Sequence, residues 1–510
     1  MSENEHYIEL EADKFRDYCI SLNSSGKYYP RLMFAVDLRQ SNDCFRIYMV
    51  FSELGNDIFQ IPFFNLMGDT PAYKSLTPDI PAVHWYEREI RDMFGLVPEG
   101  HPDMRRLVFH DSFPRDSYPL RKDWSIDKTD LREWGEGLIK KVPYNFMEVE
   151  GEGVYEIPVG PVHAGIIEPG HFRFSAVGET IFFLEPRLFY THKGTEKHFE
   201  GMSFSDGVRL AERVSGTSSF SHSAAYCMAV ERMAGIEITE KAAAVRTILL
   251  ELERLYNHVG DIGNMCAGTG LTVGNAYGAV IKEKLLQLNA RLTGSRYLRG
   301  INIIGGVTGD VFLKADDILK TIEITKVEYK KFMKMLLGTI SHIERLENTG
   351  KLSHDIALSL GVTGVAARAS GINDDIRKAH PHFLYDNLEF EPHTSGKCDV
   401  YARMMVRAEE AECSISMINA LLEGGYNGDL AVEVADIPAD DSALGYTETP
   451  RGSVFYFVMS DSEGRPFRVK LRSPSFCNWP AVPFAVHGEM VPDFPLCNKS
   501  FNLSYSGCDM

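Results

Sequence analysis

One stretch decides the interpretation of this chain: Arg213-Val-Ser-Gly-Thr-Ser-Ser-Phe-Ser-His222. It places two serines, Ser215 and Ser218, three residues apart and ends on a histidine. Near the other end, Asn502-Leu-Ser-Tyr-Ser-Gly-Cys-Asp-Met510 places a serine and a glycine at the same separation. A thiolate is a strong ligand for soft metals, whereas a serine hydroxyl, with its far higher pKa, is a poor one. The two stretches therefore have the spacing of a metal site without its ligands.

Both stretches resemble the large subunits of nickel–iron hydrogenases. The first is similar to their R-x-C-G-x-C-x-x-x-H motif and the second to D-P-C-x-x-C-T-x-R. The resemblance implies that all four nickel-ligating cysteines are replaced, at Ser215, Ser218, Ser504 and Gly507. We therefore expect a hydrogenase relative that holds no metal and is not itself a hydrogenase.

The N-terminal region is predicted to be a small α+β domain over residues 30–95. Its strand-like runs, at 31–37 and 45–51, are joined by Ser41-Asn-Asp, which has the composition of a turn.

Three further stretches identify what this domain resembles. They are Trp85-Tyr-Glu-Arg-Glu-Ile-Arg-Asp-Met-Phe-Gly-Leu, Gly100-His-Pro-Asp-Met-Arg-Arg-Leu and Tyr118-Pro-Leu-Arg-Lys-Asp-Trp124. Together they closely resemble the E-R-E-x-x-D-x-F-G, G-H-P-D-x-R-R and P-L-R-K-D signature of a small peripheral-arm subunit of respiratory complex I. We assign residues 1–124 to this domain.

A second, larger domain is expected over residues 151–510, after a linker at 125–150 that has mixed charge and no sustained periodicity. From Glu156 onward the chain resembles the quinone-site subunit of complex I and the homologous hydrogenase large subunit. The expected fold class is α+β, with a small N-terminal α+β domain followed by a mainly helical domain that has strands at its margins.

Helices are predicted from the spacing of apolar residues. Such residues recur at steps of four and three between Val245 and Val259, which predicts a helix over 240–260 with Thr239 as its N-cap. Further helical patterns span 276–292, 315–347 and 399–423. Strands are expected at 172–174 and 181–184 and in a late hairpin of 453–459 with 466–471.

Composition narrows the function classes. The formal net charge is −18 and there is no basic run, which argues against binding to nucleic acid. No apolar run approaches the roughly 20 residues that cross a bilayer, and the first residues do not resemble a signal peptide. We expect a cytoplasmic protein that lies on the inner face of the cell membrane through partner subunits.

The nine cysteines show no C-x-x-C spacing. Iron–sulfur and zinc sites draw on closely spaced cysteines, so we expect no cofactor in this chain and iron–sulfur clusters in its partners. Cys508, one residue beyond a replaced ligand position, could still line the site as a lone thiolate.

The candidate catalytic residues follow from resemblance at matching positions. In Gly160-Pro-Val-His-Ala-Gly-Ile-Ile-Glu-Pro169, Glu168 occupies the place of a proton-relaying glutamate of hydrogenases. His163 matches the first of two histidines in the quinone-site loop of complex I, but Ile167 stands at the second. Gly216 falls near the position of that site's tyrosine. His163 could equally be a histidine whose ring is satisfied by the backbone of a tight loop.

Two further candidate catalytic residues join Glu168 and His163. They are His222, which ends the first stretch, and Arg451. It lies in Glu448-Thr-Pro-Arg-Gly452, which resembles the hydrogenase E-A-P-R-G motif. A buried arginine needs a partner, and we expect Glu168 to pair with it, unless other carboxylates do. A structural ion network is expected from Lys193, Glu196, Arg368 and Arg377.

Three functions remain open. The first is a large subunit, without a nickel–iron centre, of a membrane-associated oxidoreductase complex that couples electron transfer to ion translocation. Its expected partners are a small cluster-bearing subunit, a ferredoxin-like iron–sulfur subunit and integral membrane subunits, including antiporter-like ones. The second is a quinone-type oxidoreductase subunit with a rebuilt site. The third is a non-catalytic scaffold that bridges cluster-bearing and membrane subunits.

Overall fold

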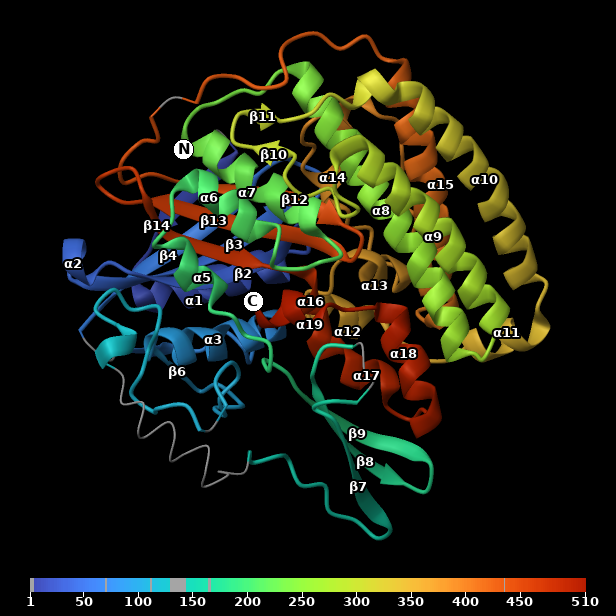
Figure 1. Ribbon diagram of the computed structural model, residues 1–510. Coiled ribbons are helices and arrows are strands. Elements are labelled where there is room, and N and C mark those ends of the chain that lie inside the picture. The colour runs from blue at the N-terminus through green and yellow to red at the C-terminus, as the bar shows by residue number, and fades with distance from the viewer. Residues whose placement is uncertain (1–3, 69–70, 111, 129–143, 164–166, 435) are drawn as a thin grey trace.

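The computed structural model describes residues 4–68, 71–110, 112–128, 144–163, 167–434 and 436–510 (Figure 1). The α+β class is confirmed. Of the expected linker, residues 129–143 lie outside the described residues, and the domain boundaries stay a prediction. Among the helices described, none is long and apolar enough to cross a bilayer.

The N-terminal part is built on a four-stranded sheet in the order β1-β4-β3-β2. The predicted strands are β2 (Tyr28–Asp37) and β3 (Cys44–Glu53), which pair antiparallel, and the short helix α2 (Arg39–Asn42) lies between them. Asp43 completes the connection in the left-handed region, at φ 52°. The other elements of this part are β1 (Glu5–Glu9), α1 (Ala12–Ser24), β4 (Phe59–Met67), β5 (Ala72–Lys74), α3 (His84–Phe94) and β6 (Val97–Glu99).

Long helices form one side of the second part (Figure 1). The helix predicted over 240–260 begins as expected, because the hydroxyl of Thr239 accepts a hydrogen bond from Ala242 N. This helix extends further than predicted, to Gly268. The pattern over 315–347 forms two helices rather than one, since the first ends at Leu337 and Gly338 and Thr339 separate it from the second. The helices of this bundle are α8 (Glu240–Gly268), α9 (Thr272–Thr293), α10 (Ala315–Leu337), α11 (Ile340–Leu346) and α15 (Val400–Glu423).

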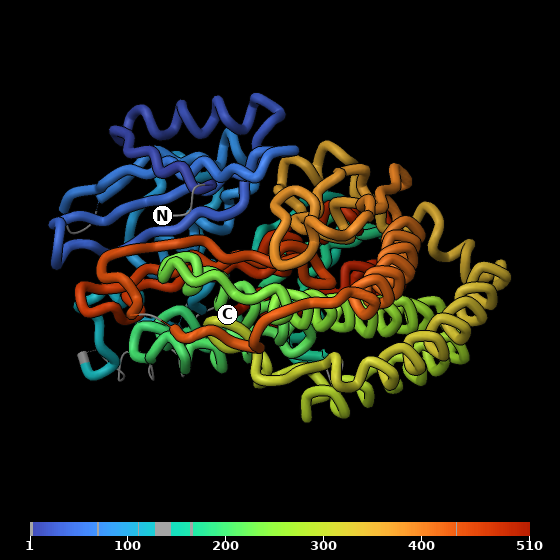
Figure 2. Tube along the Cα trace, turned by 90° about the horizontal axis from the view of Figure 1, so that it is seen from above, coloured from blue at the N-terminus to red at the C-terminus, as the bar shows by residue number. Residues whose placement is uncertain are grey.

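The late strands do not lie at the margin. They form a three-stranded antiparallel sheet of β12 (Ser442–Thr449), β13 (Gly452–Ser460) and β14 (Pro466–Arg472). Figure 2 shows this sheet between the N-terminal elements and the helix α7 (Ser219–Met233). Phe457 of β13 packs on Phe34 of β2, with ring centroids 4.6 Å apart. These strands are buried on both faces because the N-terminal sheet covers one and α7 the other.

A second small sheet does lie at the margin. It is an antiparallel meander of β7 (Val154–Val159), β8 (His171–Val177) and β9 (Thr180–Arg187), which projects from the body in Figure 1. The N-terminal part reaches it through Arg105, whose guanidinium forms an ion pair of 2.5 Å with Glu185 of β9. The shorter helices of this part are α5 (Thr195–Phe199), α6 (Phe204–Ala211), α12 (His354–Ser359), α13 (Gly364–Ala369), α14 (Ile376–Ala379), α16 (Pro474–Asn478), α17 (Val482–Val486), α18 (Phe494–Phe501) and α19 (Tyr505–Asp509).

Candidate functional site

The two serine-containing stretches meet in space. The hydroxyl of Ser215 lies 3.2 Å from the hydroxyl of Ser504, although the two residues are 289 positions apart. Gly507 is beside both, since a Cβ atom added to it would lie 3.0 Å from Ser504 Oγ and 3.3 Å from Ser215 Cβ. Ser218 is buried at the N-cap of α7, and its N–H donates to the carbonyl of Ser215 at 3.2 Å. Ser215, Ser504 and Gly507 therefore lie together, and Ser218 follows Ser215 in the same turn.

The first stretch is positioned by the start of α7. Beneath this helix, the buried carboxylate of Glu253 accepts hydrogen bonds from the N–H groups of Phe220 (2.8 Å) and Ser221 (3.0 Å). These are N–H groups of the first turn, which have no partner inside the helix. Burial raises the pKa of Glu253 to about 7, against the lowering effect of these bonds. The carboxyl thus holds the turn that carries Ser215 against α8.

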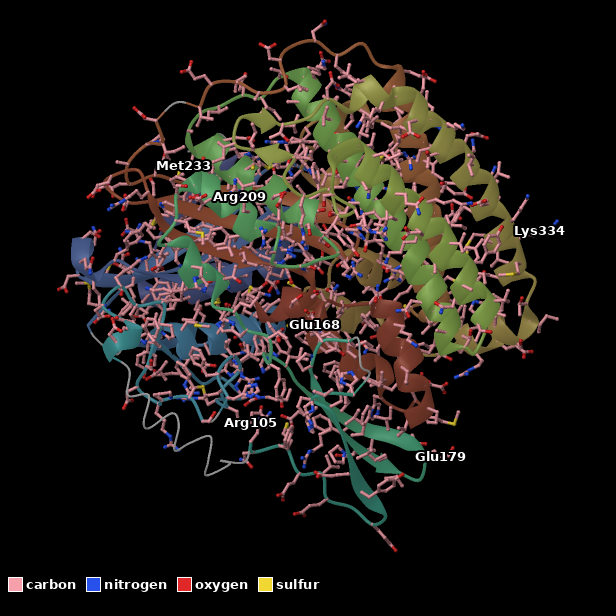
Figure 3. All side chains as sticks on the ribbon, in the orientation of Figure 1. Arg105, Glu168, Glu179, Arg209, Met233 and Lys334 are labelled. Atoms are coloured by element: carbon pink, nitrogen blue, oxygen red, sulfur yellow. The ribbon has the colours of Figure 1, made fainter. Side chains whose placement is uncertain are left out.

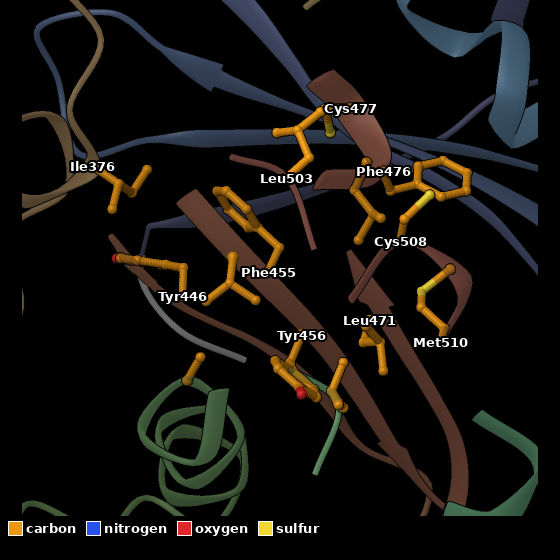
Figure 4. Close-up of a cluster of buried hydrophobic side chains, with 14 of the residues drawn as sticks. Ile376, Tyr446, Phe455, Tyr456, Leu471, Phe476, Cys477, Leu503, Cys508 and Met510 are labelled. Carbon is orange, nitrogen blue, oxygen red and sulfur yellow. The ribbon is translucent and has the colours of Figure 1, made fainter. Parts of the chain in front are cut away.

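The second stretch is anchored in the core. Figure 4 shows Leu503, Cys508 and Met510 among the buried side chains around β13 and β14. Ser504 caps α19 by accepting a hydrogen bond from Gly507 N at 2.9 Å. Cys508 is fully buried, and burial raises the pKa of its thiol well above its ordinary value, which favours the thiol over the thiolate.

A set of hydroxyl groups occupies the centre of the site. Ser504 Oγ lies 3.3 Å from Ser506 Oγ, and Ser215 Oγ lies 3.3 Å from Thr217 Oγ1. We call Ser215, Thr217, Ser504 and Ser506 the hydroxyl site. These residues do not fit a nickel–iron centre, because the soft thiolate donors that such a centre needs are absent from the four positions.

Glu168 borders the hydroxyl site. Its carboxylate accepts a hydrogen bond of 2.8 Å from Ser506 N, while the side chain itself is exposed. Figure 3 places it at the centre of the view, beside the C-terminal helices. Lys193 is also here, donating to the carbonyl of Ser506 at 3.3 Å. Glu168 and Lys193 thus hold opposite charges at the same short helix.

Arg451 approaches the site from the turn between β12 and β13, but it does not form the expected ion pair with Glu168. Among the described residues its carboxylate partner is Asp261 of α8, at 3.7 Å. It also donates to the carbonyl of Asn502 and, at 3.3 Å, to Asn257 Oδ1. The pairing differs because α8 passes directly under the turn, whereas Glu168 lies across the hydroxyl site.

A chain of polar groups nevertheless connects Glu168 to Arg451. It runs from Ser506 through Ser504 and Ser215 to Thr217, whose carbonyl accepts a hydrogen bond of 2.8 Å from the side-chain amide of Asn257. The two predicted residues are therefore linked residue by residue, although the link passes through the covalent structure of Ser506, between its N–H and its hydroxyl, and of Thr217, between its hydroxyl and its carbonyl.

The two histidines differ in position. His163 lies at this site, half-buried, with Nδ1 3.1 Å from the carbonyl of Pro161 and its ring 6.2 Å from that of Tyr505. His222 lies inside the fold and shares a hydrogen bond of 2.9 Å with Tyr456 of β13. Burial lowers the pKa of His222 to about 3, so it is neutral. The packing role of His222 is clear, and its predicted catalytic role has no contact with the hydroxyl site to support it.

Asn257, Asp261 and Asn502 were missed by sequence reasoning. A signal existed for two of them, because Arg254, Asn257 and Asp261 follow each other at helical spacing in and directly after the helix predicted over 240–260. The expected ion network is confirmed for Arg368 and Arg377, which are buried among carboxylates. Glu196 belongs to a separate group with Arg468 and Lys470.

The fold and the site define a large subunit of the complex I and hydrogenase type, and the four positions that the sequence resemblance matched to nickel ligands carry three serines and a glycine. The family model of the 30 kDa subunit of respiratory-chain NADH dehydrogenase matches residues 8–130. That of the 49 kDa subunit matches residues 269–442 and 429–510. The chain therefore belongs to the family in which these two complex I-type domains are fused in one polypeptide.

Known relatives agree with this assignment. Formate hydrogenlyase subunit 5 of Escherichia coli (strain K12) is 35% identical over 484 residues, covering 94% of this chain and 84% of that protein. Hydrogenase-4 component G of the same organism is 35% identical, covering 94% and 83%. The C/D subunit of the NADH-quinone oxidoreductase of Phocaeicola vulgatus is 30% identical, covering 80% and 82%.

A solved structure is also similar. It is that of the membrane-bound sulfane sulfur reductase, an archaeal respiratory membrane complex. One of its chains is 27% identical with a TM-score of 0.66, covering 71% of this chain and all of that one. The relatives thus belong to hydrogenase-like, complex I-like and other respiratory membrane complexes.

Proposed function

We propose that this chain is the large subunit of a membrane-associated oxidoreductase complex that couples electron transfer to ion translocation without a nickel–iron centre. One observation carries the proposal: the hydroxyls of Ser215 and Ser504 lie 3.2 Å apart at positions of metal-ligating cysteines, with Gly507 beside them. The chain of polar groups from Glu168 to Arg451 supports a remaining task at this site that involves charge.

The electron carriers in this proposal belong to partners. Iron–sulfur clusters would sit in a small subunit facing the hydroxyl site and in a ferredoxin-like subunit. Integral membrane subunits, including antiporter-like ones, would move the ion, and this chain would lie on the inner face of the membrane. The scattered cysteines support this division, because no spacing in the chain offers a four-thiolate set.

The experiment is metal analysis and transport on the intact complex, purified through a tag on a partner subunit. We expect nickel at background level, no hydrogen uptake or evolution, and ion uptake into vesicles when the complex turns over. Stoichiometric nickel would overturn the absence of the metal centre. A complex that transfers electrons without moving ions would overturn the coupling.

A second candidate function is the reduction of a small anionic acceptor at the hydroxyl site. It is favoured by the hydroxyl groups of the site, which can donate hydrogen bonds to an anion, whereas the charges of Lys193 and Arg451 at the two ends are offset by Glu168 and Asp261. The similar chain of a sulfane sulfur reductase also favours it. Turnover of the complex with a polysulfide, compared with a quinone, tests this candidate and separates it from the quinone-type alternative.

A further inference from the structure

Behind the hydroxyl site lies a group of buried ionised side chains between α8, α13 and α15. We call it the buried ion cluster. Its ion pairs measure 2.6–3.8 Å, and each member is 3% exposed or less. The members are Arg31, Arg254, Arg368, Arg377, Glu251, Asp374, Asp375, Glu410 and Glu448. This group is distinct from the residues that form the hydroxyl site.

The carboxylates of the cluster do not have equal numbers of cationic partners. The guanidinium of Arg368 contacts the carboxylates of Glu410 (2.8 Å), Glu448 (2.9 Å) and Asp375 (3.4 Å). Each of these carboxylates has a further donor, but that of Glu448 is an uncharged backbone group, Ile376 N, at 3.4 Å. Asp375 pairs with Arg377 at 2.7 Å, and Glu410 is bonded to a histidine at 2.7 Å. Among the described residues, Glu448 has Arg368 as its one ion-pair partner, and it shares that partner with two other carboxylates.

Glu448 is therefore the least compensated carboxyl of the cluster. A buried carboxylate without full compensation is neutralised by a proton, because an uncompensated charge in the interior is costly. Burial and the nearby Asp375 raise the pKa of Glu448 to about 7, while Arg368 and Arg254 oppose the shift. By contrast, Arg254 and Arg377 lower the pKa of Glu251 to about 2.

The pKa values of the other titratable groups around Glu448 are shifted away from neutral pH. The pKa values of Asp374 and Glu410 are lowered by Arg31 and Arg368, respectively, so both stay ionised. The pKa of His258, which is bonded to Glu410, is lowered by burial, so it is neutral. Beyond these, Arg407 pairs with Asp261 at 3.5 Å.

Glu448 is connected to the hydroxyl site through its own strand. Arg254 donates to the carbonyls of Glu448 (2.6 Å) and Thr449 (3.3 Å). The hydroxyl of Thr449 then accepts a hydrogen bond of 3.1 Å from Arg451 N. Arg451 in turn reaches Asn257 at the edge of the hydroxyl site. A change of charge at Glu448 therefore occurs three residues before Arg451 in the chain and alters the electrostatic environment of that arginine.

The cluster also meets the surface. Arg377 and Glu410 line a cavity of about 250 Å³, together with Glu409, Glu412 and His393. Inside the cluster, Arg368 Nη2 and His258 Nδ1 are buried and have no hydrogen-bond partner among the described residues. Glu410 thus lies between this cavity and Arg368, and the two unused polar atoms lie on the side chains bonded to its carboxylate.

We propose that Glu448, which shares the guanidinium of Arg368 with two other carboxylates, binds and releases one proton, and that this proton sets the charge beside Arg451 and the hydroxyl site. The reaction is the addition of a solvent proton to a carboxylate oxygen of Glu448, with no change in oxidation state. The role in ion coupling rests on the proposed function, whereas proton binding itself does not.

The test is infrared difference spectroscopy on the full-length chain, titrated from about pH 6 to about pH 8. We expect the carbonyl absorption of a protonated carboxylic acid to disappear with a midpoint near 7. Glu253 and Glu89 are also buried with pKa values of about 7, so the Glu448 component is isolated by the difference between wild type and Glu448→Gln. Glu423→Gln, which removes an exposed carboxyl, is the matched control and should leave the absorption unchanged.

Two outcomes decide the matter. Loss of one component in Glu448→Gln supports the proposal, and identical titrations of wild type and Glu448→Gln overturn it. If Glu448→Gln does not fold, Glu448→Asp keeps a titrating acid and should move the midpoint of that component, and an unmoved midpoint overturns the proposal. Because these spectra need no partner subunit, a failed transport experiment and a failed titration are told apart.

Discussion

The carboxylate of Asp261 lies 3.7 Å from the guanidinium of Arg451 and 3.5 Å from that of Arg407. All three side chains are buried, so one carboxylate compensates two guanidiniums. Repulsion between the arginines is visible in the pKa of Arg407, which burial lowers and Arg451 lowers further. Asp261 is thus the centre of the charge balance on this side of the hydroxyl site.

Asp261→Asn should destabilise the protein more than Arg451→Met. The first change leaves two buried guanidiniums without a carboxylate, which typically costs about 3–5 kcal/mol. The second leaves Asp261 paired with Arg407 and removes one of the repelling charges. Thermal unfolding of both variants measures which one loses more stability. Asp386→Asn, which changes an exposed aspartate, is the control. Equal loss in the two variants would contradict the shared carboxylate.

Glu168→Gln should preserve assembly and stop turnover-driven ion transport. The amide oxygen can still accept the hydrogen bond from Ser506 N, so the fold is kept, but the exposed negative charge is lost. Transport into vesicles by the intact complex is the measurement, and electron transfer is followed in the same preparation. A fully active Glu168→Gln complex would remove Glu168 from the coupling.

A Ser215→Cys, Ser504→Cys double variant should form a disulfide under oxidising conditions. The two hydroxyl oxygens lie 3.2 Å apart, and small side-chain movements would bring sulfurs to the bond length of about 2.05 Å. Mass spectrometry of the peptides detects the link. Ser504→Cys combined with Ser416→Cys, which places the second thiol at an exposed position of α15, is the matched control and should stay reduced.

Stability should fall as pH drops below about 6.5, and His222 should contribute to the loss. Its pKa is about 3 in the folded chain, so below the unfolded pKa only the unfolded state binds the proton. The contribution of His222 to the free energy of unfolding is therefore fully present above about pH 6.5. Below that pH it falls by about 1.4 kcal/mol per pH unit. Thermal unfolding of His222→Gln at about pH 7 and pH 5 should show a smaller decrease than wild type. His198→Gln, at an exposed position, should show the same decrease as wild type.

Local signals predicted much of the fold. The N-cap at Thr239, the late hairpin and the strands of the N-terminal sheet follow from spacing and turn composition. The convergence of Ser215 and Ser504 followed from the resemblance of their motifs. The partner of Arg451 could not be predicted in this way, because it depends on how α8 is rotated beneath the β12–β13 turn. The central position of β12–β14 was likewise set by packing between distant segments.

Arg31 of β2 donates two hydrogen bonds, of 2.6 and 2.7 Å, to the carboxylate of Asp374, and both side chains are buried. One residue of the N-terminal sheet is thus a member of the same charge group as Glu448. A protein that docks on the N-terminal part and shifts its sheet would strain this contact. The N-terminal sheet thus supplies the guanidinium that lowers the pKa of Asp374, and the charge balance of the interior depends on how the two parts pack together.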